Sequence, residues 1–241
     1  MKVDKFRTVI IYIIIILLGL VCLLPLLNIV AISFSSSAAV EGNMVGLIPV
    51  GFSTAAYEKI LEDSQFWHSF LISVERVVLT LIINFVLIVL MAYPLSKTNA
   101  QFRGRNIYAN LMIFAMLFNG GMIPTFLLVK SYGLLNTVWA LVLPGAVPIF
   151  NVILVMNFFA AVPKELEEAA FIDGANPFQV LTKIFIPISK PVLATVSLFS
   201  IVGSWNDFYS GLIYMSKAAC YPLTQDPVQT AKEAVLYARQ H

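Results

Sequence analysis

The chain has 241 residues, of which 59% are hydrophobic and 12% are charged, and its mean hydropathy is +0.88. Soluble domains carry about 25% charged residues, so half of the charge that a water-exposed surface needs is missing. The high hydrophobicity excludes a disordered chain, and the presence of only two cysteines excludes a disulfide scaffold. The net charge of +2 is too small to indicate nucleic-acid binding. The composition indicates a protein that lies in a lipid bilayer.

Five apolar segments are long enough to cross about 30 Å of hydrocarbon as helices. They cover residues 8–33, 69–96, 107–129, 138–160 and 188–215. The first segment follows a basic N-terminus, which is also a feature of cleaved signal peptides, but it exceeds the roughly 7 to 15 apolar residues usual there. We therefore expect an all-α membrane protein with five transmembrane helices.

Lys and Arg residues are distributed unevenly over the connections between these segments. Nine of them lie in the N-terminus, after the second segment and after the fourth, whereas Lys59 and Lys130 are the two in the alternate connections. Since basic residues favour the cytoplasmic side, we expect the N-terminus, residues 1–7, to be cytoplasmic. The connections at about 34–66 and 130–137 are then extracellular.

The connection at 161–187 begins with a pattern that is typical of a short helix. Pro163 suits a first helical position, and Glu165, Glu167 and Glu168 follow where the helix dipole favours acidic side chains. Gly174 can end this helix in the left-handed conformation that glycine adopts without strain. The pattern predicts a helix followed by a glycine turn.

A second short helix is predicted after this turn. Asn176 can cap it, Pro177 can occupy its first position, and it should end before Pro187. Three apolar residues lie near the turn, and they either pack against the protein's own helix ends or form a docking surface for a soluble partner: Phe171, Ile172 and Phe178.

The same connection carries a spaced motif. Glu168-Ala169-Ala170 is followed after three residues by Gly174, after nine more by Ile184, and then by Ile186-Pro187. This pattern resembles the EAA loop of membrane subunits in binding-protein-dependent ABC importers, with isoleucine at 186 where leucine is usual. That exchange conserves volume and apolarity.

The resemblance extends from the first apolar segment to about Leu223 and is strongest to carbohydrate importers related to MalG. Residues 118–125 (Phe-Asn-Gly-Gly-Met-Ile-Pro-Thr) and 203–207 (Gly-Ser-Trp-Asn-Asp) look like the branch that handles complex saccharides. The resemblance implies the type I importer permease fold, with residues 8–216 as the transmembrane domain. It also implies a multi-pass plasma-membrane subunit that translocates a saccharide.

The resemblance implies that the EAA loop seats in a cleft of an ATPase subunit and moves when two such subunits close on ATP. The implied coupling residues are Glu168, Ala169, Ala170, Phe171, Asp173, Gly174 and Phe178. The chain has no phosphate-binding G-x-x-x-x-G-K-[ST] loop, so ATP and Mg²⁺ belong to the partner, and no cofactor is expected on this chain. The implied partners are a second permease of similar fold, two cytoplasmic ATPase subunits and an extracellular solute-binding protein.

Two polar stretches inside the apolar segments are candidates for the substrate path, because polar groups in lipid usually face a cavity or another helix. One is Asn119, Gly120 and Gly121, which forms either a packing kink or a hinge beside the path. The other is Trp205, Asn206 and Asp207, which offers an aromatic face and hydrogen-bonding groups to a sugar. Alternatively, Trp205 belongs to the outer aromatic belt and Asp207 pairs with a neighbouring helix.

Catalysis and metal binding have little support in the sequence. His68 and His241 are the only histidines and are far apart, so a helical zinc pair is excluded. We expect no catalytic or metal site in this chain. Two other functions remain as alternatives: a permease for peptides or amino acids, and a membrane scaffold subunit without a transport path.

Residues 217–241 differ from the rest of the chain. They carry Lys217, Lys232 and Arg239 and contain no apolar run of spanning length. The resembling importers have a sixth span that returns the C-terminus to the cytoplasm, so we expect this tail to be truncated or altered.

Overall fold

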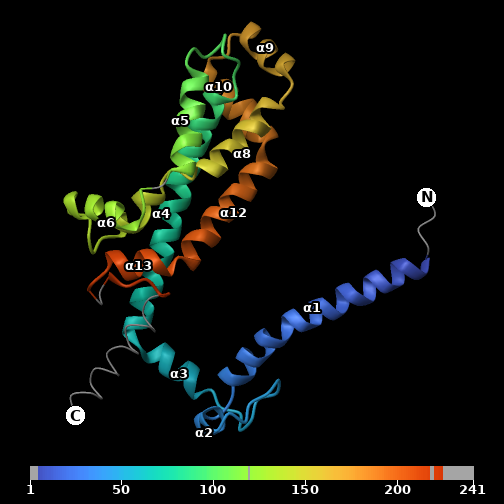
Figure 1. Ribbon diagram of the computed structural model, residues 1–241, viewed down its shortest axis with the longest axis vertical. Helices are drawn as coiled ribbons and strands as arrows, with labels where there is room; N and C mark the ends of the chain where they lie inside the picture. The colour runs from blue at the N-terminus through green and yellow to red at the C-terminus, as the bar shows by residue number, and fades with distance from the viewer. Residues whose placement is uncertain (1–4, 119, 218–219, 225–241) are drawn as a thin grey trace. The chain divides into compact units, whose positions relative to one another are not determined.

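The computed structural model describes residues 5–118, 120–217 and 220–224, and every regular element in these ranges is a helix (Figure 1). The chain divides into two compact units, Met1–Trp67 and His68–His241. The predicted all-α class is confirmed. The predicted Asn119 position and most of the 217–241 tail lie outside the described residues.

The first unit is dominated by one long helix, α1 (Lys5–Ser33), followed by α2 (Ser37–Glu41) and α3 (Ala55–Glu62). Apolar side chains are exposed all around α1, which is the pattern of a helix that crosses lipid. The segment after α1 folds back on its end, because the amide of Asn28 donates to the carbonyl of Gly46 at 2.7 Å. Phe34 also stacks on Phe52 with ring centroids 5.7 Å apart.

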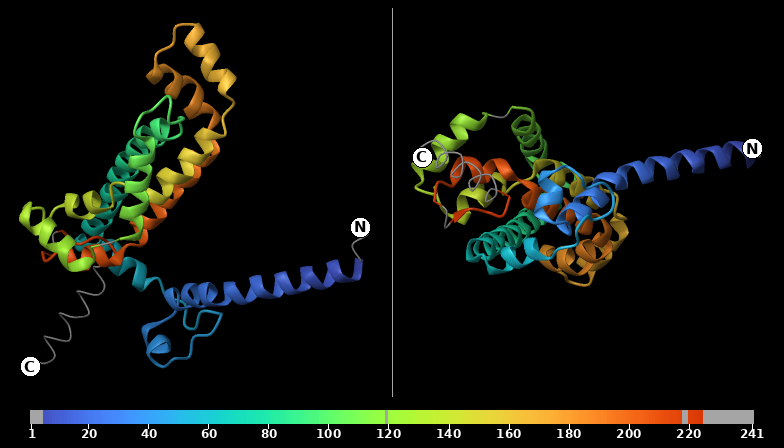
Figure 2. Two further views of the ribbon diagram at one scale, coloured as in Figure 1. Left: turned by 45° about the horizontal axis from the view of Figure 1, so that its top comes forward. Right: turned by 90° about the horizontal axis from the view of Figure 1, so that it is seen from below.

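The remaining helices form the second unit, except that the first residues of α4, up to Trp67, belong to the first unit. They are α4 (Ser64–Leu95), α5 (Arg105–Leu117), α6 (Met122–Ser131), α7 (Val138–Val142), η1 (Leu143–Gly145), α8 (Ile149–Ala160), α9 (Lys164–Ile172), α10 (Pro177–Val180), η2 (Leu181–Phe185), α11 (Ile186–Ile188), α12 (Lys190–Asn206) and α13 (Phe208–Tyr214). In this unit α4, α5, α8 and α12 run side by side (Figure 1). The segment with α9 and α10 lies at one end, and α6 and α13 lie at the other (Figure 2).

Two helices in the described part of the chain are long and apolar enough to cross a membrane alone, Thr8–Ser33 and Ser64–Leu95. Three bent helix pairs pass the same test when each pair counts as one span, which gives up to five spans. The pairs are Arg105–Leu117 with Met122–Ser131, Val138–Gly145 with Ile149–Ala160, and Pro177–Ile188 with Lys190–Asn206. The two single helices and three bent pairs follow the order of the five predicted segments, although the last pair begins at Pro177 and ends at Asn206 rather than covering 188–215.

The fifth segment differs from its prediction as one continuous helix over 188–215. The helix α12 ends at Asn206, and α13 begins at Phe208. The break is at Asp207, whose carboxylate Oδ1 accepts from the backbone N–H of Ser210 at 3.1 Å and so caps α13. An acidic side chain competes with the helix for backbone donors, which explains why the apolar pattern alone missed the break.

The end of the second short helix was also predicted wrongly. Helical structure continues from Pro177 through Pro187 to Ile188, by way of the π-helical turn η2. A proline lacks the N–H that an α-helix needs and crowds the preceding turn, and a wider turn before it relieves both problems. Pro187 therefore lies inside the helix rather than after it.

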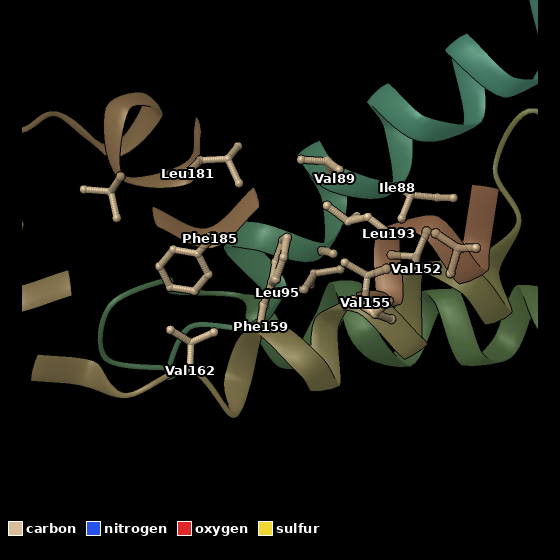
Figure 3. Close-up of a cluster of buried hydrophobic side chains, with 14 of the residues drawn as sticks. Ile88, Val89, Leu95, Val152, Val155, Phe159, Val162, Leu181, Phe185 and Leu193 are labelled. Carbon is tan, nitrogen blue, oxygen red and sulfur yellow. The ribbon is translucent and has the colours of Figure 1, made fainter. Parts of the chain in front are cut away.

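The main apolar core of the second unit joins its long helices. It includes Ile88 and Val89 of α4, Val152, Val155 and Phe159 of α8, Phe185 of η2 and Leu193 of α12 (Figure 3). Phe159 and Phe185 meet edge to face with centroids 5.4 Å apart. Since lipid gives helices no hydrophobic reason to associate, close packing of this kind holds the bundle together.

Candidate functional site

The connection 161–187 forms the helix, glycine turn and helix that its sequence predicts. Pro163 is the N-cap of α9 rather than its first helical residue, a difference of one position. At the other end, the N–H of Gly174 donates to Phe171 at 3.1 Å, and the N–H of Ala175 donates to Ala170 at 2.9 Å. This is a Schellman motif, and the Gly174 φ of 79° is the left-handed conformation that it requires.

The second helix begins with a complete capping box. The Asn176 side chain accepts from the Gln179 N–H at 2.9 Å, and the Gln179 side chain accepts from the Asn176 N–H at 2.9 Å. Pro177 is the first helical residue, as predicted. Both ends of the turn are therefore fixed by local hydrogen bonds, which gives the loop a defined shape.

The predicted coupling residues form an exposed surface on this loop. Glu168, Ala169, Asp173 and Gly174 are exposed, and Ala170 is half-buried against the core. The apolar side chains Phe171, Ile172 and Phe178 are 43%, 86% and 66% exposed. Phe171 is partly covered and lines a cavity with Lys97 and Glu167, whereas Ile172 and Phe178 are mostly exposed, so the three leave an apolar patch on the surface of the loop.

One acidic residue of α9 points the other way. Glu167 is buried, and its carboxylate Oε2 accepts from the Lys97 Nζ at 2.8 Å. The sequence pattern predicts Glu167 only as an acidic residue near the start of the helix and does not predict its pairing with Lys97. Glu167 lies three positions before the half-buried Ala170 and so shares its face of the helix.

Lys97 lies in a largely apolar setting just after α4. Burial lowers the pKa of its ammonium group, and the hydrogen bond and the charge of Glu167 act in the opposite direction. The nitrogen lies 4.1 Å from the ring centroids of both Tyr93 and Phe185. The carboxylate and the two ring faces thus compensate for lost hydration of the cation.

A polar stripe follows one face of α4. Its members are buried and are spaced by three or four residues: Ser69, Ser73, Arg76, Thr80 and Asn84. Asn84 donates to the Ser200 hydroxyl of α12 at 3.2 Å, and Ser73 accepts from the N–H of Leu223 at 2.8 Å. The spacing of three and four puts these residues on one face of α4, and this signal is visible in the sequence.

Arg76 forms an ion pair with Asp207. Its Nη2 donates to the Asp207 carboxylate, and its Nη1 donates to the Asp207 carbonyl at 2.9 Å. The arginine side chain is 4% exposed, so the carboxylate is what compensates its charge inside the bundle. Of the two interpretations of Asp207, the structure shows pairing with a neighbouring helix.

A cavity of about 240 Å³ lies beside this pair. Its polar lining includes Arg76, Thr80, Asn84, Asn151, Ser200 and Asp207, and α7, η1 and the loop before α8 add apolar residues. Three buried atoms here have no hydrogen-bond partner within the described ranges: Arg76 Nε, Thr80 Oγ1 and Asn84 Oδ1. Unpaired polar atoms of this kind call for water or a ligand.

Of the described path residues predicted from the sequence, Gly120, Gly121, Trp205 and Asn206 do not line this cavity. Trp205 packs edge to face on Phe70, with centroids 6.2 Å apart, and is 39% exposed. Gly121 caps α6 with φ 86° and ψ 177°, a conformation that is nearly restricted to glycine. A Cβ at Gly121 would meet no atom within 4 Å, so backbone conformation rather than close helix packing requires this glycine in the described chain.

Comparison with known proteins agrees with this architecture. A family described as "Binding-protein-dependent transport system inner membrane component" matches residues 48–237. Since the match covers more than half of the chain, this protein belongs to that family of transport permeases. It is a membrane protein, as its apolar helices indicate.

Particular relatives include the protein LplC of Bacillus subtilis strain 168, which is 44% identical over 205 residues, covering 85% of this chain and 69% of that protein. The polygalacturonan/rhamnogalacturonan transport system permease protein YtcP of the same strain is 41% identical over 220 residues, covering 91% and 76%. A crystal structure of a bacterial ABC transporter involved in the import of the acidic polysaccharide alginate matches with TM-score 0.87 and 33% identity, covering 95% of this chain and 81% of that chain.

Proposed function

We propose that the chain is the membrane-spanning permease subunit of an ATP-driven importer, and that it translocates a saccharide delivered by an extracellular solute-binding protein. The observation that carries the proposal is the exposed apolar patch of the 161–187 loop, which stands on a rigidly capped helix pair and bears the EAA motif. The names of the relatives support a saccharide, since YtcP and the alginate transporter both serve polysaccharides.

In this proposal the loop couples the permease to a separate ATPase. Phe171, Ile172 and Phe178 seat in the ATPase, with Glu168 as a polar contact, while exposed Ala169 allows close approach. Gly174 shapes the turn through its left-handed conformation. ATP and Mg²⁺ stay with the ATPase, and two ATPase subunits and a second permease complete the complex.

The proposed orientation has the N-terminus and the 161–187 loop in the cytoplasm. Its support is the excess of Lys and Arg in the N-terminus and in the connections after the second and fourth spans. The connection at 34–66 then faces the binding protein, which carries the substrate to the outer side.

The proposed substrate path includes the polar cavity beside Arg76 and Asp207. Its support is the polar lining and the three unpaired atoms, since a hydrated path needs such groups within the bundle. Asp207 is then held in place by Arg76, and Asn206 and Trp205 precede it at the end of α12. Gly120 and Gly121 allow the backbone to turn between α5 and α6.

The test is purification of the chain, tagged, from its native membrane after mild detergent extraction, followed by mass spectrometry. The proposal expects two further kinds of protein in a stable complex, an ATPase with a phosphate-binding loop and a second permease. A scaffold subunit would purify without an ATPase, and a complex that binds peptides or amino acids but no oligosaccharide would identify the other alternative. Either result would overturn the proposal.

A further inference from the structure

The ion pair between Lys97 and Glu167 connects two parts of the chain that have different places in the fold. Glu167 belongs to α9, whose opposite side is exposed, whereas Lys97 follows the end of α4, the longest helix in the second unit. Their charged atoms are 2.8 Å apart, and the side chains are 11% and 12% exposed. Water therefore screens this pair far less than it screens a surface pair.

Lys97 is also held from the core side. Its Nζ lies 4.1 Å from the Tyr93 and Phe185 ring centroids, and these two rings meet edge to face at 5.1 Å. Phe185 in turn packs on Phe159 in the centre of the apolar core (Figure 3). The Lys97 ammonium group is thus held against the end of α4 and against the apolar core. A displacement of Glu167 therefore pulls on both of them through the ion pair.

The surroundings of the pair are not continuously packed. A cavity of about 340 Å³ is lined by both charged residues and by residues on either side of them: Tyr93, Pro94, Gln101, Phe102, Phe171 and Pro177. An open space of this size gives α9 room to shift against α4 if only apolar contacts resist it. At the wall of this cavity, the ion pair joins the two elements through a short, directional bond.

We propose that Lys97 and Glu167 are positioning residues that make α9 and the end of α4 move together when the loop is displaced. The proposal rests on the proposed function, in which α9 contacts the ATPase. Neither residue is on the exposed patch, so the pair acts by transmitting displacement and not by binding the ATPase. Loss of the pair leaves an ATPase that is bound and active but poorly connected to the membrane helices.

The test compares Lys97→Met, Lys97→Arg and a control, Lys190→Met, in the complex purified with its partners and reconstituted in liposomes. Lys190 is an exposed lysine at the start of α12. Its replacement by methionine makes the same chemical change at a position outside the Lys97–Glu167 ion pair. We expect Lys97→Met to lower saccharide transported per ATP hydrolysed by about tenfold, with ATPase content unchanged. Lys97→Arg keeps the charge and stacks on the rings, so it should stay within about threefold of wild type.

A distance measurement separates this role from a merely structural one. Spin labels at the exposed positions Glu165 of α9 and Leu90 of α4 report the separation of the two helices with and without ATP. When the Lys97–Glu167 ion pair is intact, the distribution of distances between the two labels should stay narrow and unchanged when ATP is added. In Lys97→Met it should shift or broaden with ATP, because α9 then moves without α4.

The outcomes distinguish the two proposals. If the wild-type complex lacks an ATPase or does not transport, the proposed function fails. If wild type transports and Lys97→Met shows the same transport per ATP and the same spin-label distances, the proposed function stands, and the proposal that the ion pair makes α9 and the end of α4 move together is wrong. If Lys97→Met simply falls apart, Glu167→Gln, which keeps the shape and a neutral acceptor, is measured in its place with the same expectations.

Discussion

At the scale of single residues, the Arg76 and Asp207 pair stands out because both charges lie within the apolar part of the chain. Arginine and aspartate are costly there unless they compensate each other. The bidentate contact of the guanidinium with the carboxylate and carbonyl of Asp207 supplies that compensation. It also holds the break between α12 and α13 against α4.

Removing one partner should therefore destabilise the protein more than removing both. Asp207→Asn should lower the free energy of unfolding by about 3 to 5 kcal/mol, because the buried arginine charge is left uncompensated. Arg76→Met should lower it by less, because the Asp207 side chain that remains is 31% exposed and partly hydrated. The double variant should recover much of the loss. The measurement is thermal unfolding of the purified complex, and equal losses in the single and double variants would contradict the ion pair.

At Gly174 the left-handed backbone conformation, and not a lack of room for a side chain, requires glycine. Its φ is 79°, and a Cβ there would meet nothing within 4 Å. Gly174→Asn should lower ATPase activity coupled to transport by less than about threefold, since asparagine tolerates this conformation. Gly174→Val should lower it by more than about tenfold, because a β-branched residue disfavours the left-handed region and would deform the turn. Similar activities for the two variants would show that the turn geometry is not what matters.

At the scale of elements, the α9 to α10 loop was largely readable from the sequence. Gly174, Asn176 and Pro177 have local roles, so their spacing alone predicts the turn, the cap and the second helix. Pro187 misled the prediction because the helix widens into a π-turn before it, and nothing in the local pattern distinguishes that solution from a helix end.

The exposed apolar patch gives a prediction about partner binding. Ile172→Ser and Phe178→Ser together should leave the unfolding free energy of the permease within about 0.5 kcal/mol, since both side chains are exposed. The same variant should lose most of the co-purified ATPase, because apolar contact area is removed from the interface. The control is Ile48→Ser, which removes another highly exposed isoleucine from the 34–66 connection, which is proposed to be extracellular. ATPase retention in the double variant would show that the patch is not the docking surface.

At the scale of the whole molecule, the apolar length of the segments predicts the candidate spans, whereas it does not predict which residues pair between them. Lys97 with Glu167 and Arg76 with Asp207 are separated by 70 and 131 positions, and a single sequence contains no signal for contacts at such distances. The polar stripe on α4 was visible in its spacing, but its partner helix was not. The sequence therefore left Asp207 with two interpretations, a sugar contact or a partner on a neighbouring helix, and only the structure identifies Arg76 as that partner.

The topology makes its own prediction. In a chain with Cys22 and Cys220 replaced by serine, a cysteine at Ile48 should react with a membrane-impermeant maleimide on intact cells. A cysteine at Ile172 should react only after lysis, because the positive-inside distribution puts the 161–187 loop in the cytoplasm. Both positions are highly exposed, so lack of access within the fold does not explain a negative result. The reverse labelling pattern would invert the proposed orientation.

The most direct measurement of the central claim is uptake of oligosaccharides into liposomes that contain the purified complex, with ATP supplied on the side of the 161–187 loop and the solute-binding protein on the other. The account predicts accumulation of a saccharide that requires ATP and the binding protein and that is lost in Gly174→Val. Hydrolysis of ATP without accumulation of any saccharide, or accumulation that is equal without ATP, would contradict it.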